Sequence, residues 1–184
     1  MDFDSPATTL VVTFGGLRQR VGIPYFEFVK MLRPYALKKL FVRDIHGLWY
    51  QRGVPGIPGG VAGLRDLLKD VIREAGIQRT VFIGNSGGGY AAILFGALVD
   101  ASEVHAFNPK SNIDPLWRLR KWDIKDFNIR SILRLLLMRG RDKQYDDLAR
   151  VLADTPQTPA STSITVRGTS WTRKIVSACS ISPM

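Results

Sequence analysis

The stretch that decides the fold is VFIGNSGGGYAA (81–92). Residues 79–84 are apolar on both faces of an extended chain and predict a strand in the centre of a parallel sheet. The run GGYAAILFGALVDA (88–101) has few charges and predicts a helix that is mostly covered. Between them, GNSGG (84–88) matches G-x-S-x-G. This spacing predicts a sharp strand-to-helix turn that lifts the Ser86 hydroxyl out of the sheet, because small neighbours avoid clashes with the strand and the helix.

Around this stretch, strand-like and helix-like segments alternate along the first 110 residues. We expect strands over 9–14, 38–44, 79–84 and 103–109, and helices over 25–34, 61–76 and 88–101. The glycine- and proline-rich stretch 46–60 predicts a loop. This alternation predicts parallel strands joined by right-handed crossovers. The predicted fold class is therefore α/β, a three-layer sandwich with a mostly parallel sheet.

The C-terminal part of the chain does not continue this alternation of strand-like and helix-like segments. Residues 129–140 and 145–154 predict two helices, and residues 110–127 are a candidate cap segment. The stretch 159–184 has no acidic residue and almost no amphipathic period, so we expect an irregular tail there and one domain over 1–158. Our hypothesis is that this tail is a frameshifted end, in which case the sheet lacks its last strands.

Composition excludes several classes of protein. The chain has 184 residues, 45% of them hydrophobic, which is ordinary for a globular domain. A single cysteine, Cys179, cannot form an internal disulfide, and the polar start MDFDSPATT is not the pattern of a signal peptide. The most apolar run, 91–99, is far shorter than a membrane span. We therefore expect a cytoplasmic protein without a membrane span.

The net charge of +10 comes from 26 basic and 16 acidic residues, with the excess concentrated in the C-terminal half. Regularly spaced aromatic residues for base stacking are absent, so the sequence predicts a solvated basic face and no nucleic-acid partner. Two histidines and one cysteine at unrelated positions do not form a metal-ligand pattern. Neither a metal nor another cofactor is expected, and no oligomeric state follows from the sequence.

Ser86 is the candidate nucleophile because a serine on such a turn exposes its hydroxyl. The backbone N–H of Gly87, at the start of the following helix, is a candidate donor to a developing oxyanion. The alternative interpretation is a turn serine that only caps this helix. A nucleotide-binding site is disfavoured, because no acidic residue ends the next strand and no lysine follows the glycines as in a P-loop.

Two motifs, GNSGGGYAA (84–92) and AFNP (106–109), resemble bacterial hydrolase-like proteins of the α/β-hydrolase superfamily, some of them associated with surface-polysaccharide gene sets. The resemblance covers roughly residues 8–115. It implies Ser86 as nucleophile and Gly87 as one oxyanion donor. It also implies a second donor from the loop after the first strand, at Gly16 or Leu17, for which a plain tight turn is the alternative.

The partners that such a serine needs are harder to find. The superfamily order is serine, acid, histidine, yet His46 and His105 are the only histidines and none follows residue 105. His46, after the second strand, is a candidate base in the wrong order, whereas His105 is expected to be packed inside a strand. Asp114 is a candidate acid, with a turn or cap role as the alternative. Activity as an enzyme is therefore left open.

The sequence thus predicts a serine-hydrolase-like protein acting on an ester or related acyl bond, in an acylated sugar or a small ester, with activity impaired by the missing histidine. An aromatic-walled entrance is expected from Trp49, Tyr50, Trp117 and Trp122. The alternative function is a non-catalytic, basic interaction or glycan-binding protein of the same fold, which would use the two tryptophans of the cap segment.

Overall fold

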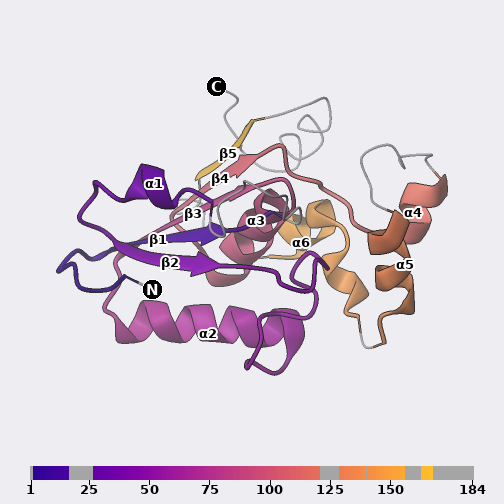
Figure 1. The fold of residues 1–184 in the computed structure, drawn as a ribbon, viewed down its shortest axis with the longest axis horizontal. Coiled ribbons are helices and arrows are strands. Elements are labelled where there is room, and N and C mark those ends of the chain that lie inside the picture. The colour runs from indigo at the N-terminus through magenta and orange to yellow at the C-terminus, as the bar shows by residue number, and fades with distance from the viewer. Residues whose placement is uncertain (1, 17–26, 121–128, 140, 156–162, 168–184) are drawn as a thin grey trace.

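The computed structural model describes residues 2–16, 27–120, 129–139, 141–155 and 163–167. The elements, in chain order, are β1 (Thr9–Phe14), α1 (Val29–Leu32), β2 (Lys38–Val42), α2 (Gly60–Glu74), β3 (Arg79–Asn85), α3 (Gly87–Val99), β4 (Glu103–Phe107), α4 (Pro115–Arg120), α5 (Ile129–Leu137), the short 3-10 helix η1 (Lys143–Tyr145), α6 (Leu148–Asp154) and β5 (Ser163–Arg167). Figure 1 shows the sheet between helices on its two sides.

The strands form one parallel sheet in the order β2-β1-β3-β4-β5 (Figure 1). This confirms the predicted α/β fold. In the register, Phe14 of β1 lies beside Gly84 of β3, and Asn85 of β3 lies beside Phe107 of β4. Three strands therefore end side by side, and the loops that leave them meet at one edge of the sheet.

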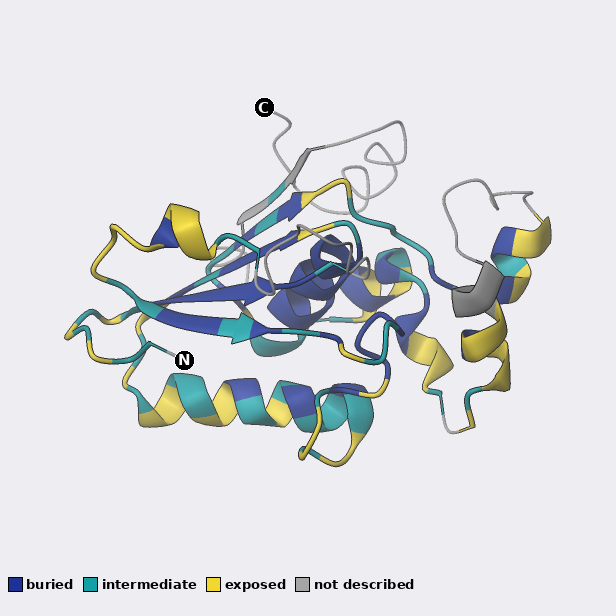
Figure 2. Cartoon of the chain, in the orientation of Figure 1, coloured by how far each residue is buried: buried dark blue, intermediate teal, exposed yellow. Residues whose placement is uncertain are grey.

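The two faces of the sheet are covered unequally. One face packs against α2, α3 and α6 in the main core, and α3 is almost entirely buried (Figure 2). The other face packs against α1 in a smaller cluster around Val11, Leu32 and Ile83. The predicted three layers are present, and the apolar sequence of α3 is explained by its burial.

The structure corrects two expectations about element bounds. β5 lies inside the stretch 159–184, so the expectation of an irregular tail is wrong for its five residues. Of the helix expected over 25–34, the structure shows only the four residues of α1. In the candidate cap segment, α4 covers Pro115–Arg120, and residues 121–128 lie outside the described part of the chain.

The two outer glycines of the G-x-S-x-G motif are required by close backbone approach. A Cβ atom at Gly84 would lie 2.0 Å from the carbonyl oxygen of Gly88, and one at Gly88 would lie 2.1 Å from the carbonyl oxygen of Phe14. Both contacts are far inside van der Waals distance and involve backbone atoms that cannot rotate away. The turn between β3 and α3 therefore depends on the absence of side chains at these two positions.

We predict that Gly84→Ala and Gly88→Ala each lower the free energy of unfolding by about 3 kcal/mol or more, because the strand, the turn and the helix must separate to admit the methyl group. Gly15→Ala is the control, since its Cβ would meet its nearest neighbour at an ordinary 3.7 Å. Urea denaturation of the three variants measures the effect. Equal stability of all three would contradict this account of the turn.

Candidate active site

Ser86 occupies the turn between β3 and α3 with a positive φ of 54° and a ψ of −115°. Its N–H donates to the carbonyl oxygen of Phe107 at 2.8 Å, and its own carbonyl oxygen accepts from the N–H of Tyr90 at 3.1 Å. The side chain forms no capping hydrogen bond with the helix, although Ser86 is the N-cap residue. The residue is partly exposed. The interpretation of Ser86 as a serine that caps α3 is therefore not supported by its hydrogen bonds.

The backbone of Ser86 is strained, because a residue with a side chain rarely adopts a positive φ. Such a conformation costs on the order of 1–3 kcal/mol and persists only where the surrounding structure imposes it. Here the surroundings are the two glycine contacts and the hydrogen bond to Phe107. Strain of this kind is common at functional sites, where it holds a reactive side chain in place.

Two backbone amides lie close to this turn. Gly87 is the first residue of α3 and is buried at the positive end of the helix dipole. Gly16 follows β1, and a Cβ atom there would lie 3.3 Å from the carbonyl oxygen of Asn85, which places the loop after β1 beside the turn. The structure thus brings Gly16 next to the Ser86 segment. Leu17, the alternative donor, lies outside the described residues.

Glu27 is the residue at this site that the sequence analysis missed. Its Oε1 accepts a hydrogen bond from the N–H of Gly16 at 3.2 Å. Burial raises the pKa of the Glu27 carboxyl, and the bond from Gly16 acts in the opposite direction. Nothing in the sequence pairs a glutamate with a glycine eleven positions earlier. The Glu27 carboxylate therefore accepts a hydrogen bond from the same Gly16 N–H group that was predicted to bind an oxyanion.

The chain around Glu27 is fixed to the same edge of the sheet. Phe28 follows it with a positive φ of 68°, and its ring lies 6.2 Å from the ring of Phe107. Phe107 also supplies the carbonyl oxygen that receives the Ser86 N–H. One residue at the end of β4 therefore contacts both the Ser86 turn and the segment that carries the carboxylate.

The expected aromatic entrance is not formed by Trp49 and Tyr50. Their exposed fractions are 3% and 0%, so both side chains belong to the core. The Tyr50 hydroxyl lies 2.9 Å from the carbonyl oxygen of Gly15 and 3.1 Å from that of Val42. Burial, and to a lesser degree the nearby Asp44, raises the pKa of Tyr50 well above its usual value. Tyr50 thus ties the ends of β1 and β2 together and does not line an opening to solvent.

His46 lies in the loop after β2, whose shape is set by a buried carboxylate. Asp44 accepts backbone N–H bonds from residues 46, 47, 48 and 50 at 2.7–3.0 Å. His46 lines a cavity of about 500 Å³, and Ser86 is not among the residues that line it. The described contacts do not join His46 to Ser86. The candidate base therefore has no demonstrated path to the candidate nucleophile.

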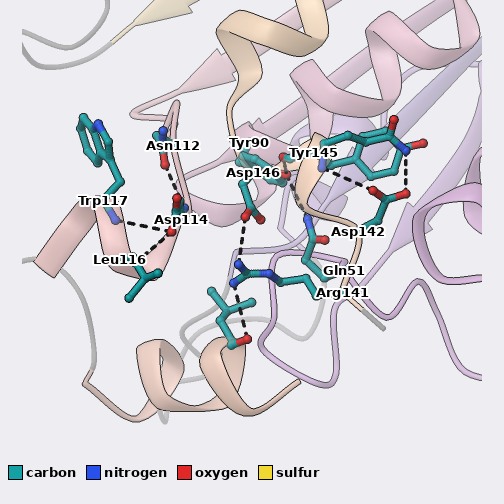
Figure 3. Close-up of polar contacts among 12 residues, drawn as sticks. Gln51, Tyr90, Asn112, Asp114, Leu116, Trp117, Arg141, Asp142, Tyr145 and Asp146 are labelled. Carbon is teal, nitrogen blue, oxygen red and sulfur yellow. Dashed lines mark hydrogen bonds and ion pairs between the residues drawn. The ribbon is translucent and has the colours of Figure 1, made fainter. Parts of the chain in front are cut away.

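Asp114 caps α4. Its Oδ1 accepts from the N–H of Leu116 at 2.9 Å and from that of Trp117 at 3.4 Å (Figure 3). This geometry favours the cap role that the sequence left open for Asp114. Trp117 is partly buried on α4, and Trp122 lies outside the described residues.

His105 of β4 was expected to be packed inside the sheet. Its side chain is 34% exposed, and its Nε2 lies 3.3 Å from Glu103 Oε2.

A buried polar network lies beneath α3 (Figure 3). The Tyr90 hydroxyl donates to the carbonyl oxygen of Tyr145 and accepts from Gln51 Nε2 at 3.2 Å. Close by, Arg141 pairs with Asp146 at 3.0 Å, and both side chains are more than nine-tenths buried. Burial, partly opposed by Arg141, raises the pKa of Asp146 to about 6. The network joins the helix that follows Ser86 to the segment around η1.

Two further findings concern the described residues as a set. They contain no group of three or more histidine, cysteine, aspartate or glutamate side chains arranged to hold a metal ion. None of the helices within the same ranges is long and apolar enough to cross a bilayer.

Comparison with solved structures finds several chains of similar fold. A variant of the capsule O-acetyltransferase of Neisseria meningitidis serogroup A, in complex with CoA, aligns over 98% of this chain and 80% of its own, with a TM-score of 0.70 and 13% identity. FphF, a fluorophosphonate-binding serine hydrolase of Staphylococcus aureus, aligns over 88% of this chain and 64% of its own, with a TM-score of 0.54 and 14% identity. An alpha/beta hydrolase from the sediment metagenome of the Mar Chica lagoon aligns over 97% and 80%, with a TM-score of 0.56 and 13% identity.

These likenesses show the fold. The parallel sheet and its helices are arranged as in these solved structures, one of which is described as an alpha/beta hydrolase. No protein-family model and no curated sequence matches the chain. At 13–14% identity the solved structures do not transfer an activity or a substrate to this chain.

The network beneath α3 predicts a pH dependence of stability. The pKa of Asp146 in the folded protein, about 6, lies above the 3.8 of an ordinary aspartate, so the folded state binds this proton more tightly than the unfolded state. Asp146 therefore makes the free energy of unfolding fall as the pH rises from about 4 to about 6. We expect Asp146→Asn to remove this contribution.

Urea denaturation of both proteins at several pH values across this range measures the difference between the two slopes. The free energy of unfolding of the wild type should decline more steeply with pH than that of the variant. Parallel curves would contradict the pKa assigned to Asp146.

Proposed function

We propose that this protein performs acyl-group chemistry at Ser86, as a serine hydrolase or acyltransferase acting on an ester or related acyl bond. The observation that carries the proposal is the conformation of Ser86, a non-glycine residue at positive φ between a strand and a helix. Its flanking glycines, its partial exposure and the nearby amides of Gly16 and Gly87 agree with a nucleophile beside an oxyanion site.

In this mechanism the Ser86 Oγ attacks the acyl carbonyl carbon and forms a tetrahedral intermediate. The N–H groups of Gly87 and Gly16 stabilise the negative oxygen, and the alcohol leaves with the proton that Ser86 gives up. Water or a second alcohol then cleaves the acyl-Ser86 ester, which restores the serine hydroxyl and releases the acid or the new ester. A base must take the serine proton, and no histidine follows the turn in the sequence. We therefore propose a slow enzyme, in which the oxyanion site and substrate binding supply a residual acceleration of roughly 10³–10⁴ over water.

The substrate class proposed is an acylated sugar or a small ester. The likeness to a capsule O-acetyltransferase and to a fluorophosphonate-binding serine hydrolase supports acyl chemistry on oxygen as the common theme. The motif resemblance to proteins linked with surface polysaccharides points the same way. A polysaccharide acyl group is therefore the first substrate to test.

A fluorophosphonate probe tests the nucleophile directly. We expect slow, stoichiometric labelling of the wild type at Ser86, located by peptide mass spectrometry, and no labelling of Ser86→Ala. Ser111→Ala is the control, because it removes a hydroxyl from another loop at the same edge of the sheet. Labelling of Ser86→Ala at the wild-type rate, or an unmodified Ser86 in the wild type, would contradict the proposal.

Glu27 should slow this reaction, because its carboxylate holds the Gly16 N–H that the negative oxygen needs. We expect Glu27→Ala to raise the rate constant of labelling several-fold. Glu27→Gln keeps an oxygen that accepts the same hydrogen bond and serves as the matched control, with a rate near that of the wild type. A rate for Glu27→Ala at or below the wild-type rate would show that Gly16 is not an oxyanion donor.

A further inference from the structure

The cavity that His46 lines is separate from the Ser86 turn and has its own chemistry. It measures about 500 Å³ and lies between the loop after β2, the start of α2 and the segment from Met138 to Tyr145. This volume falls within the range of small-molecule sites in proteins, roughly 300–1,000 Å³. None of its lining residues belongs to the Ser86 turn or to the loop after β1.

Positive charge lines this cavity from two directions. Arg52 reaches it from the loop after β2, and Arg139 reaches it from the segment after α5. In the described part of the chain neither guanidinium has an ion-pair partner. Among the described residues of the lining Asp142 is the one carboxylate, and its two oxygens accept hydrogen bonds from the backbone and side chain of Gln144. The balance of charge in the cavity is therefore positive.

The start of α2 lines the same cavity. Gly59, the N-cap residue of the 15-residue helix α2, lines it together with Gly60, Val61 and Ala62 of the first turn. No side chain caps this end, and the first turn contains no acidic residue. The N–H groups of an uncapped helix start and the helix dipole together favour an anion, and phosphate is a frequent occupant of such a position.

Gln51 is a second indication of a ligand in this cavity, independent of the charges and the helix start. The residue is 4% exposed and lines the cavity, and its Nε2 is fixed by the bond to Tyr90 (Figure 3). Its Oε1 is buried without a hydrogen-bond donor among the described residues. A buried acceptor without a donor costs on the order of 1–3 kcal/mol. A hydroxyl group on a bound ligand would satisfy it.

We propose that this cavity binds a phosphomonoester that carries a free hydroxyl group. The phosphate lies at the start of α2 between Arg52 and Arg139, and the hydroxyl-bearing part points towards Gln51. His46 is then a ligand-facing side chain of this second site, which accounts for its position away from Ser86. The proposal does not depend on the activity proposed for Ser86, because it concerns binding alone.

Isothermal titration calorimetry of the full chain with glycerol 3-phosphate tests the site, at about 0.15 M NaCl to screen non-specific attraction to the basic surface. The wild type should bind one equivalent, whereas glycerol should show no binding. Arg52→Ala/Arg139→Ala should raise the Kd at least tenfold. Lys30→Ala/Arg33→Ala is the matched control, since it removes two exposed positive charges from around α1 on the other face of the sheet and should leave the Kd unchanged.

A second variant tests the helix start without removing an arginine. Ala62→Glu places a carboxylate in the first turn of α2, where the helix dipole favours it, so the variant should remain folded and lose binding. Three results would overturn the proposal: no binding by the wild type, equal weakening in the two double variants, or unchanged binding in Ala62→Glu. Because the readout is binding, none of these results bears on labelling of Ser86.

Discussion

The close approach of three backbone segments at the end of β3 is the constraint on which the rest of the site depends. The carbonyl oxygen of Gly88 lies next to Gly84, and that of Phe14 lies next to Gly88. Neither glycine position therefore has room for a side chain. Between these two glycines Ser86 adopts a positive φ of 54°, and its N–H donates a hydrogen bond to the carbonyl oxygen of Phe107. The conformation of the proposed nucleophile thus agrees with the close backbone packing around it.

The two sites proposed for this protein both use backbone N–H groups near the carboxyl ends of the strands. At the end of β1 the N–H of Gly16 is engaged by the Glu27 carboxylate, whose pKa is raised by burial. At the start of α2 the helix end and two arginines face a cavity. The buried ties of Tyr50, Asp44 and Tyr90 connect these regions and fix the loops that carry them. The two proposed sites therefore share buried hydrogen bonds that hold the loops around them.

The fold was predictable because its signals are local. Strands and helices were placed by apolar runs and by glycine positions, and G-x-S-x-G located the turn. The contact of Gly84 with Gly88 is local, whereas the contact of Gly88 with Phe14 of β1 comes from the fold. Long-range partners escaped prediction. Glu27 reaches Gly16 across a loop without a pattern, and Trp49 and Tyr50 turned out to be core residues, because residue type alone does not separate a buried aromatic side chain from one at an entrance. β5 was missed, although its sequence SITVR alternates polar and apolar residues, because the acid-free stretch around it was interpreted as an irregular tail.

The most direct test of the central claim is a crystal structure of the protein after reaction with a small phosphonate ester. The account predicts a phosphonyl group on the Ser86 Oγ with one oxygen about 2.7–3.1 Å from the backbone nitrogens of Gly16 and Gly87, and with the Glu27 carboxylate displaced from Gly16. A Ser86 with an ordinary negative φ, or an adduct whose oxygens face away from both amides, would contradict it.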